Sequence, residues 1–445
     1  MSEATVLNKI EKFPQVDGDL GWLETTPDFN APLGLRVKGA HEFDVAIIGA
    51  GFTGISLALR YAELEPSARI AVIDALRVGE GTSGRNAGFL IDLPHNLDGG
   101  KTDVSYARAL YKLNVFAIDR LRAYKDRFAI PFWDDAGKYM SSHEEQNEAG
   151  LTSFVKMLAD AGFEYEQLSG RDLQKRLGTS YYRSAVYTPG NVLVNPAALV
   201  RGLTKALPKN VTLFENSPVT GIEYGKRHRL QFVGGSITAQ IVVQATNAFS
   251  EEFGKLSRRL APVFTYASLT PQLTDEQIRR HFNGVKSWGT TSAHPAGSTV
   301  RFTVDKRIFV RNTLDFLPEL KSTPAGLDHA WKQHRKSFEA RFPFLEQMAF
   351  EYTWGGMLAM TLNHEPVFAD AGDGVYVLGG CNGVGVVKGT YLGYYMAEHI
   401  NNIKSDNLTF IQQHSSPSWV PPDPLRTVGA RLRLTRELGA AGGDV

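Results

Sequence analysis

The fold is decided by the stretch "DVAIIGAGFTGISLALRYAE", which runs from Asp44 to Glu63. Its first residues form a short, continuous apolar run that ends in glycines, which is typical of a buried parallel strand. Apolar residues then recur at helical spacing from Ile55 to Ala62. A second apolar run, "ARIAVIDA", follows at residues 68–75. The order strand, glycine-rich turn, helix and strand predicts a βαβ unit.

The glycines of this stretch have the spacing of a dinucleotide-binding turn. Gly49, Gly51 and Gly54 match G-x-G-x-x-G between the predicted strand and the predicted helix. In that context the glycines permit a tight turn, a close approach of the backbone to a pyrophosphate, and close helix–strand packing. Asp74 ends the second strand, where its carboxylate can accept from a ribose and would repel the 2′-phosphate of NADP. The alternative is a glycine-rich turn without a ligand.

A second glycine-rich segment, "GTSGRNAG" (81–88), helps to distinguish FAD from NAD, since both can occupy such a unit. FAD carries a ribityl chain and an isoalloxazine ring beyond the pyrophosphate, and such a segment can line that extension. Ser83 and Asn86 could hydrogen-bond phosphate or ribityl oxygens, and Arg85 could add a charge-assisted contact or a structural ion pair. Taken alone, the segment could equally be an ordinary turn.

Glycine-rich signatures occur near both ends of the chain, because "DGVYVLGGCNGVGVVKG" (373–389) again reads as strand, turn and helix start. We therefore predict an α/β fold with a Rossmann-like FAD-binding domain, discontinuous in sequence, and an inserted α+β substrate domain built on a mostly antiparallel sheet. The predicted parts are an N-terminal arm laid over the surface (1–41), the FAD-binding domain (42–105, 183–255 and 350–403), the substrate domain (106–182 and 256–349) and a C-terminal tail (404–445).

Composition limits the partners to expect. The 445 residues are 43% hydrophobic and 21% charged, with a formal net charge of +1. This balance gives no electrostatic reason to expect nucleic acid or an anionic membrane. The single cysteine, Cys381, allows no intramolecular disulfide. Since no apolar run has the length of a membrane span or of a signal-peptide core, we expect a cytoplasmic protein without an integral membrane segment. A peripheral membrane contact stays open.

Five segments in order resemble the FAD-dependent oxidoreductases of the D-amino-acid oxidase superfamily, in the branch of glycine oxidase, sarcosine oxidase and gamma-glutamylputrescine oxidase. The segments are residues 44–88, "NVLVNPAALVRGL" (191–203), "VVQATNAFS" (242–250), "WGGMLAMTLNHEPVF" (354–368) and "GGCNGVGVVKGTYLG" (379–393). The resemblance implies FAD, held mainly by the first and last parts of the chain. No metal is expected, because the eleven histidines, His95 among them, show no ligand spacing.

The resemblance also assigns residues to the cofactor. The first turn would contact the pyrophosphate, Asp74 the adenosine ribose, and Val219 the adenine through its backbone. The loop from Gly383 to Lys388 would lie against the pyrimidine edge of the ring. The expected cofactor-binding residues are Gly49, Gly51, Phe52, Thr53, Gly54, Asp74, Ala75, Thr82, Ser83, Arg85, Asn86, Ala87, Gly88, Val219, Ala245, Thr246, Gly356, Cys381, Asn382, Gly383, Val384, Gly385, Val386 and Lys388.

The candidates for the catalytic site are Tyr266, Arg311, Lys388 and His364. The segment around Tyr266 faces the flavin in this superfamily, although this residue could as well be a cross-strand tyrosine. Arg301, Arg307 and Arg311 lie at even spacings, and one of them could hold a substrate carboxylate. Each could instead be a surface arginine. His364 could be a base beside the flavin or a structural histidine.

Two departures from the family's pattern bear on the substrate and on the cofactor link. Sarcosine oxidases carry a Gly-His-Gly in the C-terminal loop, followed by a carboxylate-binding lysine. Val384 replaces that histidine here, and Lys388 comes one residue after the position of that lysine, which Val387 occupies. Recognition of a small α-amino acid is therefore in doubt, and a larger amine, a polyamine derivative or a cyclic imino acid stays open. Cys381 reads as a small buried residue, so we expect FAD to be non-covalent.

The expected activity is oxidation of a C–N bond of an amine or of an amino or imino acid. A hydride would pass to the flavin N5, and the imine would then hydrolyse. The acceptor that reoxidises the flavin could be oxygen or an electron carrier. Two alternatives stay open: an FAD-dependent dehydrogenase of a 2-hydroxy acid or polyol, which needs a base, and a non-catalytic nucleotide-binding flavoprotein subunit.

Overall fold

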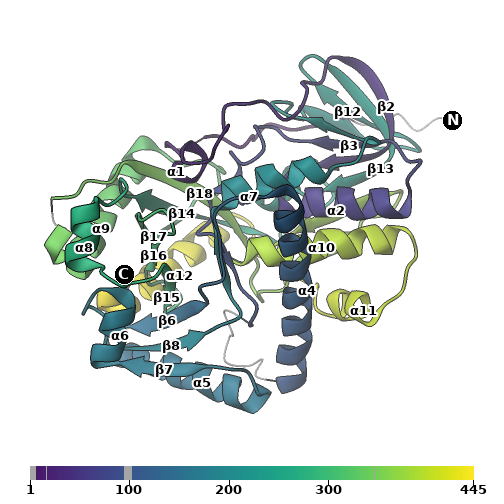
Figure 1. The fold of residues 1–445 in the computed structure, drawn as a ribbon. Coiled ribbons are helices and arrows are strands. Elements are labelled where there is room, and N and C mark those ends of the chain that lie inside the picture. The colour runs from purple at the N-terminus through teal and green to yellow at the C-terminus, as the bar shows by residue number, and fades with distance from the viewer. Residues whose placement is uncertain (1–6, 17, 95–102, 346) are drawn as a thin grey trace.

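Two large β-sheets organise the protein in the computed structural model, which describes residues 7–16, 18–94, 103–345 and 347–445 (Figure 1). His95 lies outside these residues. The helices are α1 (Gly21–Glu24), α2 (Phe52–Leu64), α3 (Thr82–Arg85), α4 (Val104–Phe128), α5 (Glu148–Ala161), α6 (Gly170–Leu177), α7 (Pro196–Leu203), α8 (Asp275–His281), α9 (Pro324–Arg341), α10 (Gly385–Ile400), α11 (Asp406–Gln413) and α12 (Leu425–Ala441).

The first sheet has nine strands and contains the βαβ unit predicted from the sequence. β2, β3 and β10 run parallel to one another, and β13 runs parallel to both β2 and β20. The nine strands are β1 (Leu7–Lys9), β2 (Gly39–Ile48), β3 (Ile70–Ile73), β10 (Val211–Phe214), β11 (Gly221–Glu223), β12 (His228–Phe232), β13 (Gly235–Gln244), β19 (Val367–Asp370) and β20 (Val375–Gly379). Chain segments from both ends of the sequence therefore share one sheet.

The second sheet has eight strands and is mostly antiparallel, as predicted, because only β15 and β6 pair in parallel. Its order is β18-β14-β17-β16-β15-β6-β8-β7. The strands are β6 (Lys138–Ser142), β7 (Glu166–Ser169), β8 (Ser184–Thr188), β14 (Ala261–Leu269), β15 (Trp288–Ser292), β16 (Thr299–Phe302), β17 (Ile308–Phe316) and β18 (Tyr352–Met360). A small third sheet joins β4 (Phe89–Leu90), β9 (Val192–Val194) and β5 (Trp133–Asp134).

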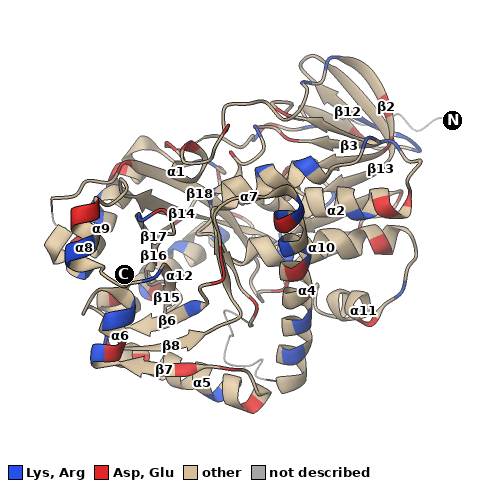
Figure 2. Ribbon diagram, viewed as in Figure 1, with Lys and Arg blue, Asp and Glu red and all other residues tan. Residues whose placement is uncertain are grey.

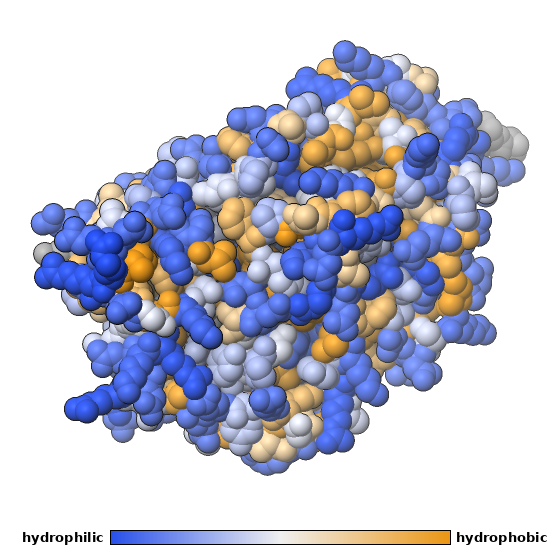
Figure 3. All heavy atoms as spheres, in the orientation of Figure 1, coloured by the Kyte–Doolittle hydropathy of each residue, from blue (hydrophilic) through white to orange (hydrophobic). Residues whose placement is uncertain are grey.

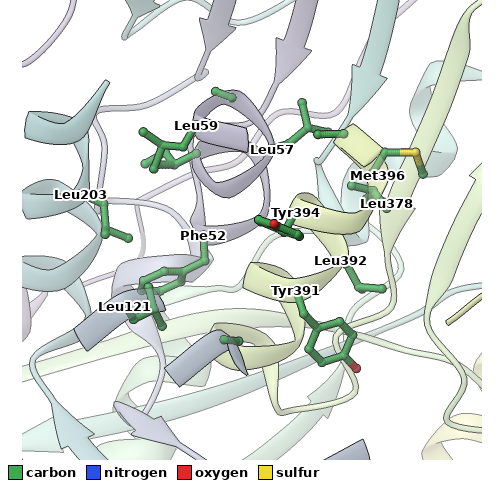
Figure 4. Close-up of a cluster of buried hydrophobic side chains, with 14 of the residues drawn as sticks. Phe52, Leu57, Leu59, Leu121, Leu203, Leu378, Tyr391, Leu392, Tyr394 and Met396 are labelled. Carbon is green, nitrogen blue, oxygen red and sulfur yellow. The ribbon is translucent and has the colours of Figure 1, made fainter. Parts of the chain in front are cut away.

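Helices α2 and α10 pack side by side although more than 300 residues separate them in sequence, and their contact forms the centre of the largest core cluster (Figure 4). Phe52, Leu57, Leu392 and Met396 belong to this cluster. A Cβ at Gly393 would collide with the carbonyl oxygen of Thr53, so the glycine allows the two helices to approach closely. This packing fixes the start of α10 beside the start of α2.

The start of α7 follows the predicted capping pattern. The Asn195 side chain accepts a hydrogen bond from the Ala198 N–H at 3.0 Å, and Pro196 takes the first helical position.

The division into domains differs from the sequence expectation at two strands and in the N-terminal arm. The segments 183–255 and 350–403 were assigned to the FAD-binding domain, but β8 and β18, which lie within them, belong to the eight-stranded sheet. Both strands are largely apolar, as buried strands of either sheet would be, so their composition does not reveal the sheet. The arm is more than a surface strap, because Trp22 is buried against Phe309 and Trp354 of that sheet.

Acidic and basic side chains are intermixed over the helices (Figure 2), and hydrophilic side chains dominate the face drawn in Figure 3. In the part of the chain that the structure describes, every helix is too short or too polar to cross a membrane.

Candidate cofactor and active site

A deep cleft lies along the carboxyl ends of the parallel strands β2, β3, β13 and β20, and elements from both ends of the chain line it. This is where nucleotides bind in open α/β sheets. The lining residues are Ile10, Lys12, Phe13, Pro14, Ile48, Gly49, Ala50, Gly51, Phe52, Thr53, Ile73, Asp74, Ala75, Leu76, Gly79, Gly81, Thr82, Ser83, Asn86, Ser217, Val219, Ala245, Thr246, Asn247, Phe249, Phe253, Leu358, Leu378, Gly379, Cys381, Gly383, Gly385, Lys388, Gly389 and Leu392.

The glycine-rich turn between β2 and α2 has the geometry of a phosphate cradle. Gly49 has φ +111°, which side-chain-bearing residues rarely adopt. A Cβ at Gly54 would collide with the Gly49 carbonyl oxygen, so the third glycine allows α2 to start close to the strand. The first N–H groups of α2 and its helix dipole therefore point into the cleft, where they favour an anion.

Asp74 closes this end of the cleft with a half-buried carboxylate. Its two oxygens accept hydrogen bonds from the Ala50 N–H and the Leu76 N–H, both at 2.9 Å. Burial raises the pKa of Asp74 to about 6, against the lowering effect of these two bonds. Each oxygen can still accept a further hydrogen bond. A ribose hydroxyl is a suitable donor, and it would favour the ionised carboxylate.

The segment 81–88 forms the short helix α3 and lies against the first turn. The Ser83 hydroxyl accepts from the Phe52 N–H at 3.2 Å, and the Asn86 side chain donates to the Ser83 carbonyl at 2.7 Å. Two tryptophan indoles hold the segment from behind: Trp22 donates to the Asn86 carbonyl at 2.9 Å and Trp354 to the Arg85 carbonyl at 3.1 Å. The segment is therefore a fixed wall of the cleft.

Two buried arginines, Arg85 and Arg301, join this wall to neighbouring elements. Arg85 donates to the Gly355 carbonyl on β18 at 2.8 Å and is not among the residues that line the cleft. Arg301, on β16, donates to the Ala87 carbonyl at 2.7 Å and to the Val194 carbonyl at 2.8 Å. The sequence suggested Arg301 as a substrate ligand or a surface residue, whereas the structure places it in the interior, bonded to backbone oxygens.

One face of α10 enters the cleft from the opposite side. Its residues Gly385, Lys388, Gly389 and Leu392 line the cleft at the spacing i, i+3, i+4 and i+7. Burial lowers the pKa of Lys388 to about 8, and nearby Cys381 opposes that shift. Within the described residues Lys388 makes no hydrogen bond or ion pair, so a half-buried ammonium faces the cleft without a counter-charge.

Most of the residues that the sequence assigned to the cofactor line this cleft. Eight do not: Gly54 packs beneath the turn, and the others are Arg85, Ala87, Gly88, Gly356, Asn382, Val384 and Val386. The sequence did not single out the arm residues Ile10, Lys12, Phe13 and Pro14, nor Ser217, Phe249, Phe253 and Leu358. The arm carries no motif, and its position at the cleft follows from contacts such as the pairing of β1 with β11.

Of the four catalytic candidates, the described lining of the cleft includes Lys388 and does not include Tyr266, Arg311 or His364. Tyr266 pairs with Gly355, and its hydroxyl donates to Asp315 at 3.0 Å on the face of the sheet that α9 covers. This location fits the alternative that Tyr266 is a tyrosine packed across neighbouring strands of the sheet. His364 lies in the turn after β18, where its carbonyl accepts from the Asn382 side chain at 2.9 Å, and it is not among the lining residues.

Arg311 lies on the opposite face of the eight-stranded sheet from Tyr266. It pairs with Ala267 on β14, which in turn pairs with Trp354 on β18. Directly paired residues share a face, so Arg311 is on the side of Trp354, the side toward segment 81–88 and the cleft. Burial lowers the pKa of Arg311 to about 10. Within the described residues its guanidinium makes no hydrogen bond or ion pair.

The donors in the cleft fit FAD. The cleft contains an acidic ribose partner, a glycine cradle, a second wall of backbone and small side chains, and a helix start with an unpaired ammonium. FAD has an adenosine ribose, a pyrophosphate, a ribityl chain and an isoalloxazine ring that these features suit in turn.

Comparison with known proteins agrees with this interpretation. The DAO family, described as FAD dependent oxidoreductase, matches residues 44–399. A probable oxidoreductase OrdL of Haemophilus influenzae is 25% identical over 385 residues, which cover 84% of this chain and 85% of the relative. A gamma-glutamylputrescine oxidoreductase of Escherichia coli is 25% identical over 370 residues, covering 80% and 83%.

A solved structure shows the same fold. Glycine oxidase from Geobacillus kaustophilus superposes with a TM-score of 0.69 at 18% identity, over 82% of this chain and 96% of that one. Members of the matched family are enzymes, which excludes the non-catalytic subunit that the sequence left open. The chain is therefore an FAD-dependent oxidoreductase and belongs to the DAO family.

Proposed function

We propose that the protein oxidises the C–N bond of an amine that also carries a carboxylate, such as an amino or imino acid. The observation that carries the proposal is Arg311, a half-buried guanidinium without a partner among the described residues, on the sheet face toward the cofactor cleft. Arginine binds carboxylates through two parallel hydrogen bonds. A relative named for an amine substrate, gamma-glutamylputrescine oxidoreductase, supports the reaction class.

The residues of the cleft would hold FAD in an extended conformation. The turn at Gly49–Gly54 and the start of α2 would bind the pyrophosphate, and Asp74 the adenosine ribose. Val219 would lie against the adenine, and Ser83 with Asn86 would line the ribityl side. The turn Gly383–Gly385 would lie at the ring. When bound, FAD supplies the acceptor for the hydride of the amine's α-carbon.

The protein's own contribution would be orientation and charge. Arg311 would fix the carboxylate end of the substrate, so that the C–H bond next to nitrogen points across to the cleft. A neutral amine can be oxidised without a side chain that first removes a proton. The described lining of the cleft fits this requirement, because its ionisable residues are Lys12, Asp74, Cys381 and Lys388. The imine product would hydrolyse in water.

The alternative, oxidation of a 2-hydroxy acid or polyol, needs a base at the hydroxyl group. His364 was the candidate for that base. Its place in the turn after β18, outside the cleft lining, favours the amine.

We further propose that FAD is bound without a covalent link. The Cys381 thiol accepts a 3.5 Å contact from the Asn247 side chain, at the start of α10 where the turn Gly383–Gly385 would meet the ring. Oxygen and an electron carrier both remain candidates for the acceptor.

Anaerobic mixing of the FAD-loaded protein with a panel of amines, amino acids, imino acids and hydroxy acids tests the proposal through the loss of flavin absorbance. We expect amines with a carboxylate to reduce the flavin fastest. Arg311→Met should lower the second-order rate constant of flavin reduction about ten- to a hundredfold, because the substrate loses a charge-assisted hydrogen bond. Arg307→Met is the matched control, since Arg307 directly precedes the same strand and pairs with Asp305 and Glu351. Reduction by hydroxy acids alone would contradict the proposal.

A further inference from the structure

The C-terminal helix α12 lies beyond the region that the family model matches and exposes an apolar stripe to solvent. Leu425, Val428 and Leu432 are 68%, 55% and 67% exposed, and their spacing i, i+3 and i+7 places them on one face. The helix packs by its other face against β17, beside the eight-stranded sheet (Figure 1). Solvated helices normally turn such a stripe inward.

Two further exposed apolar side chains lie outside α12, one in the segment that leads to it and one in the turn after β18. Trp419 is 51% exposed, and Leu362, in the turn after β18, is 54% exposed. That turn is tied to the segment before α12, because the Asn363 side chain donates to the Ser416 carbonyl at 3.0 Å and accepts from the Ser418 N–H at 3.1 Å. We call Leu362, Trp419, Leu425, Val428 and Leu432 the α12 face.

The charged side chains at the exposed positions of α12 have one sign. Arg431, Arg433 and Arg436 are exposed, and the exposed positions of α12 carry no acidic residue. The helix's one acidic side chain, Glu437, is turned toward His294, 3.7 Å away. The net charge of +1 for the whole chain conceals this local concentration of positive charge.

The α12 face is presented on a fixed scaffold. After α12 the chain enters the substrate domain, where the Asp444 carboxylate accepts from the His143 N–H and from the Asn147 side chain, both at 2.7 Å. At the other end Arg426 pairs with Asp423 at 2.6 Å. Substitutions on the outer face therefore leave the attachments of the helix intact.

We propose that the α12 face docks the protein on the surface of a bilayer that contains anionic phospholipid. Apolar side chains of this kind enter the boundary between headgroups and acyl chains, a tryptophan favours that depth, and arginines pair with lipid phosphates. A second copy of the chain fits less well. A self-complementary contact would bring the arginines of both copies together, and no exposed position of α12 supplies a carboxylate to pair with them.

Co-sedimentation with vesicles tests the proposal. The full-length, FAD-loaded protein is mixed with vesicles of equal parts phosphatidylglycerol and phosphatidylcholine, and separately with pure phosphatidylcholine. We expect binding to the anionic vesicles that weakens with added salt, and much weaker binding to the neutral ones. Each arginine contributes about fivefold to such partitioning. Removing all three in R431Q/R433Q/R436Q should therefore reduce it about a hundredfold.

A second variant, L425S/V428S/L432S, should also release the protein, because it removes the apolar stripe. The matched control, V233S/R227Q, changes an exposed valine and an exposed arginine of the other sheet and should bind as the unchanged protein does. The proposal would be overturned if the protein did not bind anionic vesicles, or if the control variant lost as much binding as the other two. It would also be overturned if analytical ultracentrifugation showed a dimer that L425S/V428S/L432S converts to a monomer. Flavin reduction by amines should be the same in all variants.

Discussion

The protonation state of Asp74 should control the affinity for FAD. Burial raises the pKa of this carboxyl to about 6. A ribose hydroxyl donates to the ionised form, so a protonated Asp74 must first lose its proton before FAD binds well. The affinity for FAD is therefore highest at a pH above the pKa of Asp74, and it falls as the pH drops through that pKa. At pH 5 about one carboxyl in ten is ionised, which predicts about a tenfold weaker affinity than at pH 7.5.

Titration of the apoprotein with FAD, followed by quenching of flavin fluorescence between pH 7.5 and pH 5, measures this dependence. Asp74→Asn should weaken binding about ten- to a hundredfold at pH 7.5, the worth of a hydrogen bond to a charged group, and should remove the pH dependence below 6. Asp44→Asn is the control, since Asp44 is an exposed carboxylate in the middle of β2 and does not line the cleft. An affinity that stays constant in the unchanged protein from pH 7.5 to pH 5, or a tenfold fall that persists in Asp74→Asn, would refute the reasoning.

Three other changes have defined outcomes. Phe13→Ser should weaken FAD binding severalfold in the same titration without altering the circular dichroism spectrum, because Phe13 lines the cleft from the arm. Arg301→Met should lower the free energy of unfolding by about 1–3 kcal/mol in urea, because two backbone carbonyls lose a buried donor. Lys388→Met should weaken FAD binding near neutral pH and flatten its pH profile above 8, since the unchanged ammonium loses its proton as the pH rises through about 8.

The parts of the fold that follow local rules could be predicted from the sequence. The apolar run before Gly49, the helical spacing after it and the capping pattern at Asn195 all depend on neighbours in sequence, and the structure contains each of them. The sharing of one sheet by both chain ends followed from two glycine-rich turns of the same type.

The sheet to which a strand belongs, and the direction in which its side chains point, could not be predicted in the same way. β18 has the composition of a buried strand, which either sheet could accommodate, and only its pairing with β14 assigns it. Tyr266 and Arg311 could each be placed on a strand, but their opposite faces follow from cross-strand register, which includes a bulge at Thr265–Tyr266. In the sequence, Arg301 and Arg311 are equally good candidates for binding a substrate carboxylate. The structure separates them, because Arg301 donates to backbone carbonyls of two distant segments.

The crystal structure of the protein with FAD tests the central claim most directly, namely that the two ends of the chain close on one extended cofactor. The account predicts electron density for the adenosine ribose at Asp74 and for the isoalloxazine ring at the start of α10, with the ring's substrate side turned toward Arg311. A ring that lies away from Gly383–Gly385, or that turns its substrate side away from Arg311, would contradict it.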